Sequence, residues 1–479
     1  MQRLNEAKKK RAIEPWCFPV SIMGILILLI IFLPFISTDK LDQRGRSQPC
    51  NDQECRLILS ESMPRHLKYP KEAPLFPSTF RTWEDLIHMA QHSIDIASFY
   101  WDLHRGEGLV SSHRSPQHQG ERIFNLLVKA GLKRKLKVRV AQSAANARFP
   151  DNDTSVLQKL GAAEVRSLNF TYLLGSGVLH TKMWIIDNRH FWVGSANMDW
   201  RSLTEVKELG LAGINCSCMA QDLAKVFSVY WYLGEEPQKP VPPHWPTAYS
   251  THINRTNPLS LFYNNSKTPS LVYMASSPPP FSSNGRNSDI DALLNVVSGA
   301  RIFVYIAVMD YTPVLQDQYG KKYWPVIDDA LRASAYSRNV TVRLLVSKWN
   351  HTNPAMVYHL RSLLALNGIM RGRIEIRWFE VPAFTPEEKD IPFARVNHNK
   401  YMVTDSCAYI GTSNWEGSYF TTTAGVSVVL SEPHSAPYSG SNDSSPSTND
   451  NTTTIRDQLE SVFVRDWSSK YASSVTIPG

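Results

Sequence analysis

Two stretches of this 479-residue chain, LHTKMWIIDNRHFWVGSANMDW at 179–200 and NHNKYMVTDSCAYIGTSNWEG at 397–417, carry the same order of distinctive residues. Each has a histidine, a lysine two positions later, an aspartate seven positions after the histidine, and then a cluster of small polar residues. The residues concerned are His180, Lys182, Asp187, His398, Lys400 and Asp405. Two such motifs in one chain indicate an internal duplication.

The segments that precede the two motifs repeat as well. In the first half, apolar β-branched runs at 93–102 and 137–143 flank a helical pattern at 120–132. In the second half, the runs lie at 301–310 and 341–347, and the helical pattern lies at 324–336. Strand–helix–strand order implies right-handed crossovers between parallel strands. We therefore predict a duplicated α/β fold of two lobes, each with a mixed, mainly parallel sheet flanked by helices, and one active site at the lobe interface.

Composition divides the rest of the chain into parts with different roles. The expected parts are a cytosolic tail at 1–15, a transmembrane helix at 16–37, a stalk at 38–59, a first lobe at 60–234, a Pro/Ser-rich connection at 235–290 and a second lobe at 291–479. The connection should contain one strand, SLVYMAS. The polar run 435–454 should be a mobile, glycosylated loop. After it, 455–467 should form an amphipathic helix that repeats 219–231.

One long apolar run, 16–36, contains SIMGILILLIIFL and no charged residue. It reaches about 30 Å as a helix, enough to cross a bilayer, whereas the apolar part of a cleaved signal peptide covers only ~7–15 residues. Lysine and arginine gather before the run, which places the amino terminus in the cytosol. We expect an uncleaved signal anchor and a single-pass type II membrane protein with a lumenal catalytic part.

Glycosylation sequons and cysteines agree with a lumenal location. Sequons follow the apolar run at Asn152, Asn169, Asn215, Asn254, Asn264, Asn339, Asn350, Asn442 and Asn451. The cysteine pairs Cys50/Cys55 and Cys216/Cys218 favour disulfides between the pairs, because a bridge between residues two apart is badly strained. A zinc site is the alternative, but no nearby histidine completes a ligand spacing. Cys407 is left over and is interpreted as a buried thiol.

The chain has a globular composition with a basic charge. Apolar residues make up 43%, the formal net charge is +8 and the pI is near 9.0. A basic surface attracts anionic substrates such as nucleic acid or lipid phosphate, but it also keeps an ordinary protein soluble. Charge alone leaves these two interpretations open.

The motifs suit phosphodiester hydrolysis without a metal or cofactor. The reaction needs a nucleophile, a proton for the leaving oxygen and positive charge on the phosphoryl oxygens. Histidine and lysine two apart on a strand face the same side, whereas each aspartate lies beyond a turn. We therefore expect the aspartates to hold or tune an imidazole rather than attack. The small polar clusters should contact phosphate through Ser195, Asn197, Ser413 and Asn414.

The paired HxKx4D motifs with their GSxN-type tails resemble the phospholipase D superfamily. The segments MDWRSLTEVKELG, YIGTSNWEG and RDWSSKYA are similar in sequence to the endolysosomal branch of that superfamily. The resemblance covers essentially residues 45–475. The resemblance implies a phosphohistidine intermediate, with His180 as nucleophile, His398 as general acid and the lysines on the phosphoryl oxygens. It also implies 5′-3′ exonuclease action on single-stranded DNA and RNA in acidic endolysosomes, after passage through endoplasmic reticulum and Golgi.

Two alternatives accompany that function. One is a lipid enzyme that hydrolyses or exchanges phospholipid headgroups, including synthesis of bis(monoacylglycero)phosphate, and the other is an inactive binding protein. A homodimer and proteolytic release of a soluble lysosomal form also stay open. The chain departs from the branch in three ways: a spacing one residue shorter between Asp405 and Gly411 than between Asp187 and Gly194, Asp405 in place of a common glutamate, and no late cysteine pair.

Overall fold

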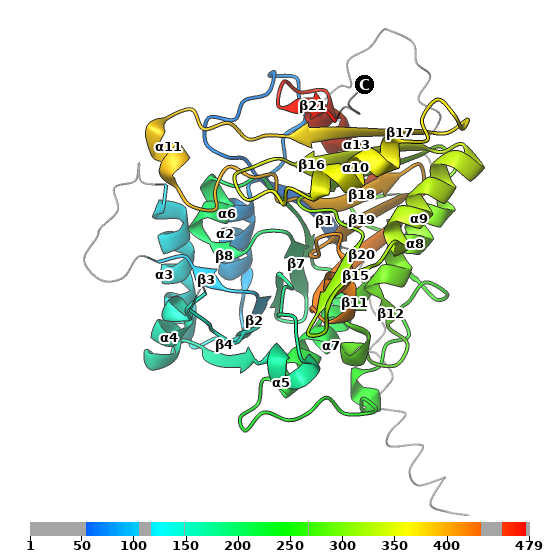
Figure 1. Cartoon of the computed structure of the whole chain (residues 1–479). Helices are drawn as coiled ribbons and strands as arrows, with labels where there is room; N and C mark the ends of the chain where they lie inside the picture. The colour runs from blue at the N-terminus through cyan, green and yellow to red at the C-terminus, as the bar shows by residue number, and fades with distance from the viewer. Residues whose placement is uncertain (1–53, 105–115, 148, 267, 433–452, 476–479) are drawn as a thin grey trace, which may run out of the picture. The chain divides into compact units, whose positions relative to one another are not determined.

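The computed structural model describes residues 54–104, 116–147, 149–266, 268–432 and 453–475 (Figure 1). The expected cytosolic tail, the transmembrane helix at 16–37 and most of the stalk lie outside these ranges, as does nearly all of the polar run 435–454. Among the helices that the structure describes, none is long and apolar enough to cross a membrane.

The first lobe is built on a seven-stranded sheet with the order β1–β9–β7–β6–β2–β4–β5. These strands are β1 (Arg56–Ser62), β2 (Ser93–Ser98), β4 (Lys137–Ser143), β5 (Glu164–Leu168), β6 (Met183–Ile186), β7 (His190–Gly194) and β9 (Glu208–Ile214). The associated helices are α2 (Thr79–Met89), α3 (His118–Leu132), α4 (Asn152–Lys159), α5 (Phe170–Leu174), α6 (Trp200–Thr204) and α7 (Ser217–Leu233). Short strands β3 (Trp101–Asp102) and β8 (Met198–Asp199) pair beside the sheet.

The second lobe is built on a ten-stranded sheet with the order β10–β11–β20–β19–β18–β13–β16–β17–β21, and β12 pairs with β11. Its strands are β10 (Leu259–Leu261), β11 (Ser270–Ser277), β12 (Asn287–Ser288), β13 (Phe303–Val308), β16 (Thr341–Ser347), β17 (Arg373–Phe379), β18 (Lys400–Thr404), β19 (Cys407–Gly411), β20 (Gly425–Ser431) and β21 (Ala472–Ser474). Its helices are α8 (Asp289–Gly299), α9 (Val326–Arg332), α10 (Met356–Leu364), α11 (Pro386–Asp390), α12 (Gly417–Thr421) and α13 (Ile455–Trp467).

The predicted duplication is confirmed in the strand order. The run β11–β20–β19–β18–β13–β16–β17 of the second sheet repeats the order β1–β9–β7–β6–β2–β4–β5 of the first. Both sheets are mixed, as expected, but the prediction that they are mainly parallel is wrong. Parallel pairing is confined to β2–β4–β5, β13–β16–β17 and β11–β12. The motif strands turn back through tight hairpins, β6–β7 and β18–β19, and such hairpins pair antiparallel.

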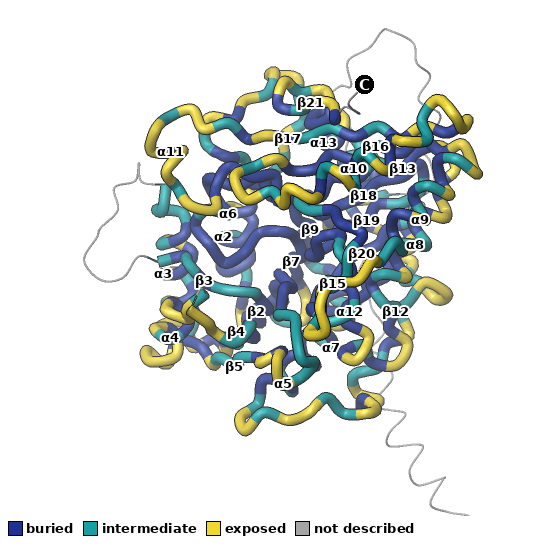
Figure 2. The backbone as a smooth tube through the Cα atoms, in the orientation of Figure 1, coloured by how far each residue is buried: buried dark blue, intermediate teal, exposed yellow. Residues whose placement is uncertain are grey.

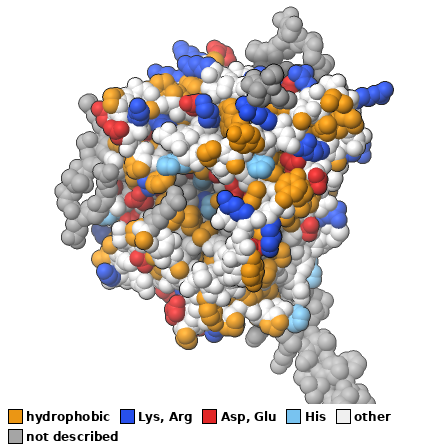
Figure 3. All heavy atoms as spheres, in the orientation of Figure 1, with side chains coloured by type: hydrophobic (Ala, Val, Ile, Leu, Met, Phe, Trp, Pro, Cys, Tyr) orange, Lys and Arg blue, Asp and Glu red, His pale blue; other side chains and the backbone are white. Residues whose placement is uncertain are grey.

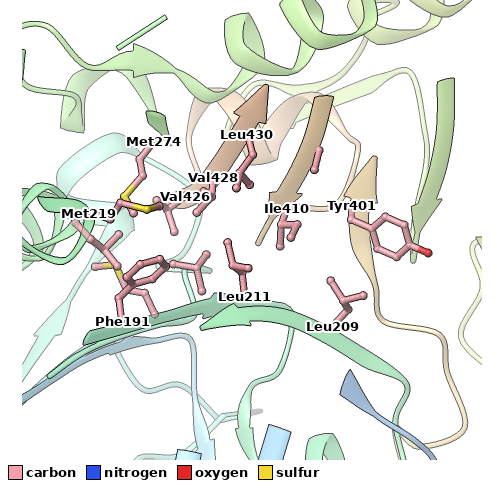
Figure 4. Packing of buried hydrophobic residues seen from close by; sticks show 14 of the residues in the cluster. Phe191, Leu209, Leu211, Met219, Met274, Tyr401, Ile410, Val426, Val428 and Leu430 are labelled. Carbon is pink, nitrogen blue, oxygen red and sulfur yellow. The ribbon is translucent and has the colours of Figure 1, made fainter. Parts of the chain in front are cut away.

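The two sheets share an apolar core at the lobe interface. Figure 4 shows Phe191, Leu209 and Leu211 of the first sheet facing strands of the second, which contribute Ile410, Val426, Val428 and Leu430. Helices α7 and α13 belong to the same core, while α2 and α3 cover the other face of the first sheet, and α8, α9 and α10 the other face of the second. The layers are therefore helix, sheet, sheet and helix, and Figure 2 shows the buried backbone concentrated along the two sheets.

Several elements coincide with the sequence predictions, but the stalk and the connection between the lobes have different boundaries from those expected. The predicted helix 455–467 coincides with α13, and SLVYMAS is β11. Strand β1 already starts at Arg56, inside the segment expected as stalk. The connection 235–290 supplies β10, β11 and β12 to the second sheet. The stalk end and the connection thus complete sheets, because an exposed sheet edge gains backbone hydrogen bonds from such strands.

The cysteines tie the start of β1 to the first lobe. Cys55 and Cys216 form a disulfide, as expected for bridging between the two pairs. Cys218 is disulfide-bonded too, whereas Cys50 lies outside the described residues. Cys407 is a free thiol that is half-buried rather than buried. Of the sequons, Asn152, Asn169, Asn339 and Asn350 are exposed, Asn215, Asn254 and Asn264 are half-buried, and Asn442 and Asn451 lie outside the described residues.

Candidate active site

Backbone hydrogen bonds between the lobes bring the two histidines together. Each histidine precedes its motif strand. Its backbone N–H bonds to the residue directly before a strand of the other lobe, β20 for His180 and β9 for His398. The His180 N–H donates to the Ala424 carbonyl at 2.9 Å, and the His398 N–H donates to the Lys207 carbonyl at 2.8 Å. Isolated β-bridges, Leu179 with Ala424 and Lys207 with Asn397, thus join the lobes at the site itself and make one site from two half-motifs.

The two lysines lie beside the histidines in a dry environment. Nζ of Lys182 donates to the His180 carbonyl at 2.6 Å, and Nζ of Lys400 donates to the His398 carbonyl at 2.7 Å. Burial lowers the pKa of Lys400 to about 8 and that of Lys182 well below its usual range. Glu208 opposes this effect on both lysines and Asp310 opposes it on Lys400, but neither pKa regains its usual value. A bound anion such as a phosphodiester would therefore stabilise both lysines as ammonium groups.

The two imidazoles have different partners, both supplied by the opposite lobe. Nδ1 of His180 lies 2.9 Å from the carbonyl oxygen of Thr412, and Nδ1 of His398 lies 2.8 Å from Oε2 of Glu208. A carbonyl oxygen accepts a hydrogen bond from Nδ1–H, and in the neutral ring this leaves Nε2 with its lone pair. A carboxylate in the same position stabilises the doubly protonated imidazolium.

Burial and the lysine charges lower the pKa of both imidazoles, and Glu208 opposes this effect on His398 alone. The pKa of His180 falls well below its usual value, so this ring is neutral. The pKa of Glu208 is itself lowered, because burial is outweighed by His398 and Lys400. His398 is therefore the ring that more readily carries a proton, and a bound anionic phosphate would favour protonation further.

Glu208 has no equivalent in the second lobe. In the sheet registers, Gly194 pairs with Gly210 and Gly411 pairs with Ser427, so the position matching Glu208 is Gly425. A Cβ at Gly425 would lie only 2.3 Å from Oγ of Ser413, which leaves no room for a side chain. The duplication is thus broken at the one position that decides which imidazole is charged.

The motif aspartates do not hold the imidazoles, contrary to expectation. Asp187 accepts hydrogen bonds from the backbone N–H groups of Gln91, His92 and Ser93 at 2.6–2.8 Å. Asp405 accepts from those of Arg301, Ile302 and Phe303 at 2.9–3.4 Å. Each carboxylate thus closes the turn between its hairpin and the adjacent strand. The imidazoles are held across the lobe interface by Thr412 and Glu208 instead.

Three of the four small polar residues carry a buried side-chain oxygen without a partner. Oδ1 of Asn197, Oγ of Ser413 and Oδ1 of Asn414 have no hydrogen-bond partner among the described residues. The hydroxyl of Ser195 instead donates to the carbonyl of Leu209 and accepts its N–H, so it joins two strands. Phosphate contact therefore stays a prediction for Asn197, Ser413 and Asn414, while Ser195 has a partner within the sheet.

A cavity of about 340 Å³ opens beside His398. Polar residues Asn197 and Glu208 line it next to the histidine, and its aromatic wall consists of Tyr100, Trp101, Phe149, Trp349 and Phe393. Tyr100 and Phe149 stack with ring centroids 4.8 Å apart. On the other side of the site, the ring of Tyr419 meets His180 edge-on at 5.0 Å. Trp200 and Trp415, which lie within the two motif stretches, are buried in the core.

Sequence reasoning missed Glu208, Thr412 and the wall residues Phe149, Trp349 and Phe393. Glu208 lies in TEVKELG, directly before an apolar strand, and a charged residue at the buried start of a strand was the available indication. The wall residues come from loops that only the fold brings together. Across the described ranges, no cluster of three or more histidine, cysteine or acidic side chains is arranged to hold a metal ion.

Known proteins are similar to this chain in sequence over most of its length. The family model described as "PLD3/4, PLD-like domain" matches residues 70–384. The chain is 45% identical over 452 residues to the 5'-3' exonuclease PLD3 of Xenopus laevis, covering 94% of this chain and 87% of that protein. It is 42% identical over 431 residues to the 5'-3' exonuclease PLD4 of Mus musculus, covering 90% and 81%.

A solved structure shares the fold at much lower identity. The phosphatidylserine synthase of Haemophilus influenzae superposes with a TM-score of 0.53 at 12% identity, over 82% of this chain and 85% of that one. This likeness concerns the fold alone, whereas the relatives above share sequence over more than four fifths of their length. The chain therefore belongs to the PLD3/4 family, whose members carry a PLD-like domain.

Proposed function

We propose that this chain is a phosphodiester hydrolase that degrades single-stranded DNA and RNA from the 5′ end through a covalent intermediate on His180. The observation that carries the proposal is the pair of buried His–Lys half-sites with unequal imidazole partners, the Thr412 carbonyl and the Glu208 carboxylate. The PLD3 and PLD4 relatives, which are named as 5'-3' exonucleases, support the substrate class and the direction.

In the first step, Nε2 of His180 attacks phosphorus while its Nδ1–H donates to the Thr412 carbonyl. The N–P bond forms, the bond from phosphorus to the leaving oxygen breaks, and protonated His398 gives that oxygen its proton. In the second step, neutral His398 takes a proton from water. The resulting hydroxide attacks phosphorus, the N–P bond breaks, and both imidazoles return to their starting states. Lys182 and Lys400 neutralise the phosphoryl oxygens throughout.

The cycle requires one neutral and one protonated imidazole, which sets its pH dependence. An ordinary imidazole has a pKa near ~6.5, and burial lowers the pKa of His398 from that value. The protonated fraction of His398 therefore increases as pH falls below neutrality, while His180, with its lower pKa, stays neutral longer. This ordering suits action in an acidic compartment such as the endolysosome.

The proposal is tested with the lumenal part of the chain at acid pH. We expect shortening of 5′-hydroxyl or 5′-phosphate oligonucleotides from the 5′ end, with full turnover in excess EDTA. His180→Ala should abolish it. Turnover of lysophosphatidylglycerol without any action on oligonucleotides would favour the lipid enzyme instead, and loss of activity on chelation, restored by Mg²⁺ or Zn²⁺, would contradict a mechanism in which lysines supply the positive charge.

The proposed location is the lumen of endoplasmic reticulum, Golgi and endolysosomes, with the chain anchored in the membrane through 16–37. The basic flank of that apolar run and the exposed sequons Asn152, Asn169, Asn339 and Asn350 support it. In sealed microsomes the carboxyl-terminal part should carry glycans and resist protease. Its digestion without detergent would show the reverse orientation.

A further inference from the structure

A small hairpin stands apart from both large sheets at the edge of the site. It consists of β14 (Val314–Asp317) and β15 (Gly320–Tyr323), which among the described strands pair only with each other. Tyr319 is 79% exposed and Tyr323 is 72% exposed, and Lys321 and Lys322 between them are exposed as well. Packing does not require two aromatic rings and two ammonium groups in solvent within the five residues YGKKY, so a binding role is indicated.

The hairpin is fixed to the helix that contacts His180. Oγ of Ser418 in α12 accepts the N–H of Gln316 and donates to its carbonyl, both at 2.8 Å. A Cβ on Gly417 would lie 2.8 Å from Cβ of Leu315, so the helix and the hairpin are in close contact. The next residue of α12, Tyr419, meets the His180 ring. The hairpin is thus held one helix away from His180.

The hairpin also reaches the first lobe. At its tip, the side chain of Gln318 lies against Gly175, five residues before His180. On its flank, the charge of Lys321 reaches Glu416 beside α12. Figure 1 shows β15 in front of the sheets on the side where the lobes meet, and Figure 3 shows Lys and Arg side chains next to hydrophobic ones near the middle of that face. Charge and aromatic rings therefore border the site where the lobes join.

We propose that this hairpin holds the single strand as it passes out of the active site. Tyr319 and Tyr323 stack on bases, while Lys321 and Lys322 contact phosphates. Lys322 now pairs with Asp317 at 3.3 Å, an exposed contact that a phosphate can replace. The inference rests on the proposed function, since the strand must occupy the site before it can cross the hairpin. The occupant is a nucleic acid, because exposed tyrosines next to lysines offer what single strands bind and the hairpin is held one helix away from His180.

The test compares a long and a short substrate. Variants Y319A/Y323A and K321A/K322A are assayed on an oligonucleotide of about twenty nucleotides, longer than the ~4–16 that one single-strand site covers, and on a nitrophenyl ester of a single nucleotide. We expect KM for the oligonucleotide to rise about 10-fold or more with little change in kcat, because stacking on exposed aromatics contributes to strand binding. The lysine variant should also reduce the salt dependence of KM. The ester, too short to reach the hairpin, should be cleaved as by the unaltered chain.

The control is an exposed tyrosine far from the hairpin in sequence. Tyr358→Ala removes a 69% exposed tyrosine from α10 and should leave KM for both substrates unchanged. An unchanged KM for the oligonucleotide in both hairpin variants would overturn the inference, as would an equal loss on oligonucleotide and ester. Loss of binding to phosphatidylserine vesicles with oligonucleotide KM retained would overturn it in favour of a membrane contact. Failure of the unaltered chain on both substrates would instead refute the proposed function.

Discussion

At the scale of single residues, the imidazole partners separate the roles of His180 and His398. Thr412 offers a neutral carbonyl and Glu208 a carboxylate, at nearly equal distances of 2.9 and 2.8 Å. Since a carboxylate stabilises imidazolium far more than a carbonyl does, the two chemically identical side chains acquire different charges at acid pH. The Ser202 hydroxyl, which donates to Oε1 of Glu208 at 2.9 Å, keeps that carboxylate in place.

Glu208→Gln should weaken the general acid without removing it. An amide does not stabilise imidazolium, so the pKa of His398 should fall further and activity should keep increasing to lower pH than in the unaltered chain. We expect kcat/KM to drop by about 10-fold or more at mildly acid pH, within the range that general acid catalysis contributes. The check is the pH profile of kcat/KM. A uniform decrease with an unshifted profile would mean that Glu208 acts only on packing.

Asp187→Asn and Asp405→Asn should affect stability rather than chemistry. Each carboxylate accepts three backbone N–H groups, and a neutral amide oxygen accepts them more weakly. We expect a loss of about 1–3 kcal/mol in the free energy of unfolding for each variant, with kcat of the folded enzyme nearly unchanged. Denaturant unfolding and kcat at low temperature measure the two effects. A large loss of kcat at unchanged stability would restore a direct catalytic role.

The residues that could be predicted were those with a fixed local spacing. His180 and Lys182 share one side of an extended segment, so their proximity follows from sequence alone. Glu208 could not be assigned in this way, because it acts on a histidine 190 residues away in the other lobe. The spacing of the aspartates suggested a role that their place at a hairpin turn does not permit.

At the scale of elements, β-branched runs identified the parallel strands, and 137–143 and 341–347 coincide with β4 and β16. The sheets as wholes were not predictable, because strand order depends on hairpins and on edge strands contributed by distant segments. Strand β1 begins in the segment expected as stalk, and β11 comes from the proline-rich connection. A local pattern gives the periodicity of a strand but not its neighbour in the sheet.

The loop that leads to His180 approaches the other lobe closely at Gly177. Gly177 has a φ of +96°, and a Cβ there would lie 2.0 Å from the carbonyl oxygen of Thr422 in the other lobe. Gly177→Ala should cost about 1–3 kcal/mol in unfolding free energy and reduce kcat, because the backbone shift reaches His180. Gly161→Ala is the matched control, since its φ is +69° but nothing lies within 4 Å of the added Cβ. Equal effects of both variants on kcat would contradict the role of the inter-lobe contact.

At the scale of the whole molecule, a buried ionic cluster joins β1 and α13 to the site. Arg465 of α13 pairs with Glu61 of β1 at 2.8 Å, and Asp466 pairs with Lys207 at 2.7 Å. The carbonyl of Lys207 accepts the N–H of His398. Burial opposes ionisation of Asp466, but Lys207 and Arg465 outweigh it and lower its pKa. The carboxylate thus stays charged in acid, and its contribution to stability is lost only as pH falls through that lowered pKa.

Asp466→Asn should therefore be strongly destabilising. It leaves the fully buried ammonium group of Lys207 without its counter-charge, for which we expect a loss of about 3–5 kcal/mol in unfolding free energy. The thermal midpoint measures it, and Lys207→Met/Asp466→Leu, which removes both charges, should recover much of the loss. A single variant as stable as the unaltered chain would show that the cluster is not needed to hold the lobes together.

In the proposed cycle, His180 attacks phosphorus and His398 moves the protons. A nitrophenyl phosphodiester has a leaving group that needs little protonation, so it should load His180 even in a His398→Ala variant. The adduct should then persist, because no base remains to activate water. Mass spectrometry of digests kept away from acid should find a phosphoramidate on His180 and none in His180→Ala. An adduct on His398 in the unaltered chain would contradict the account.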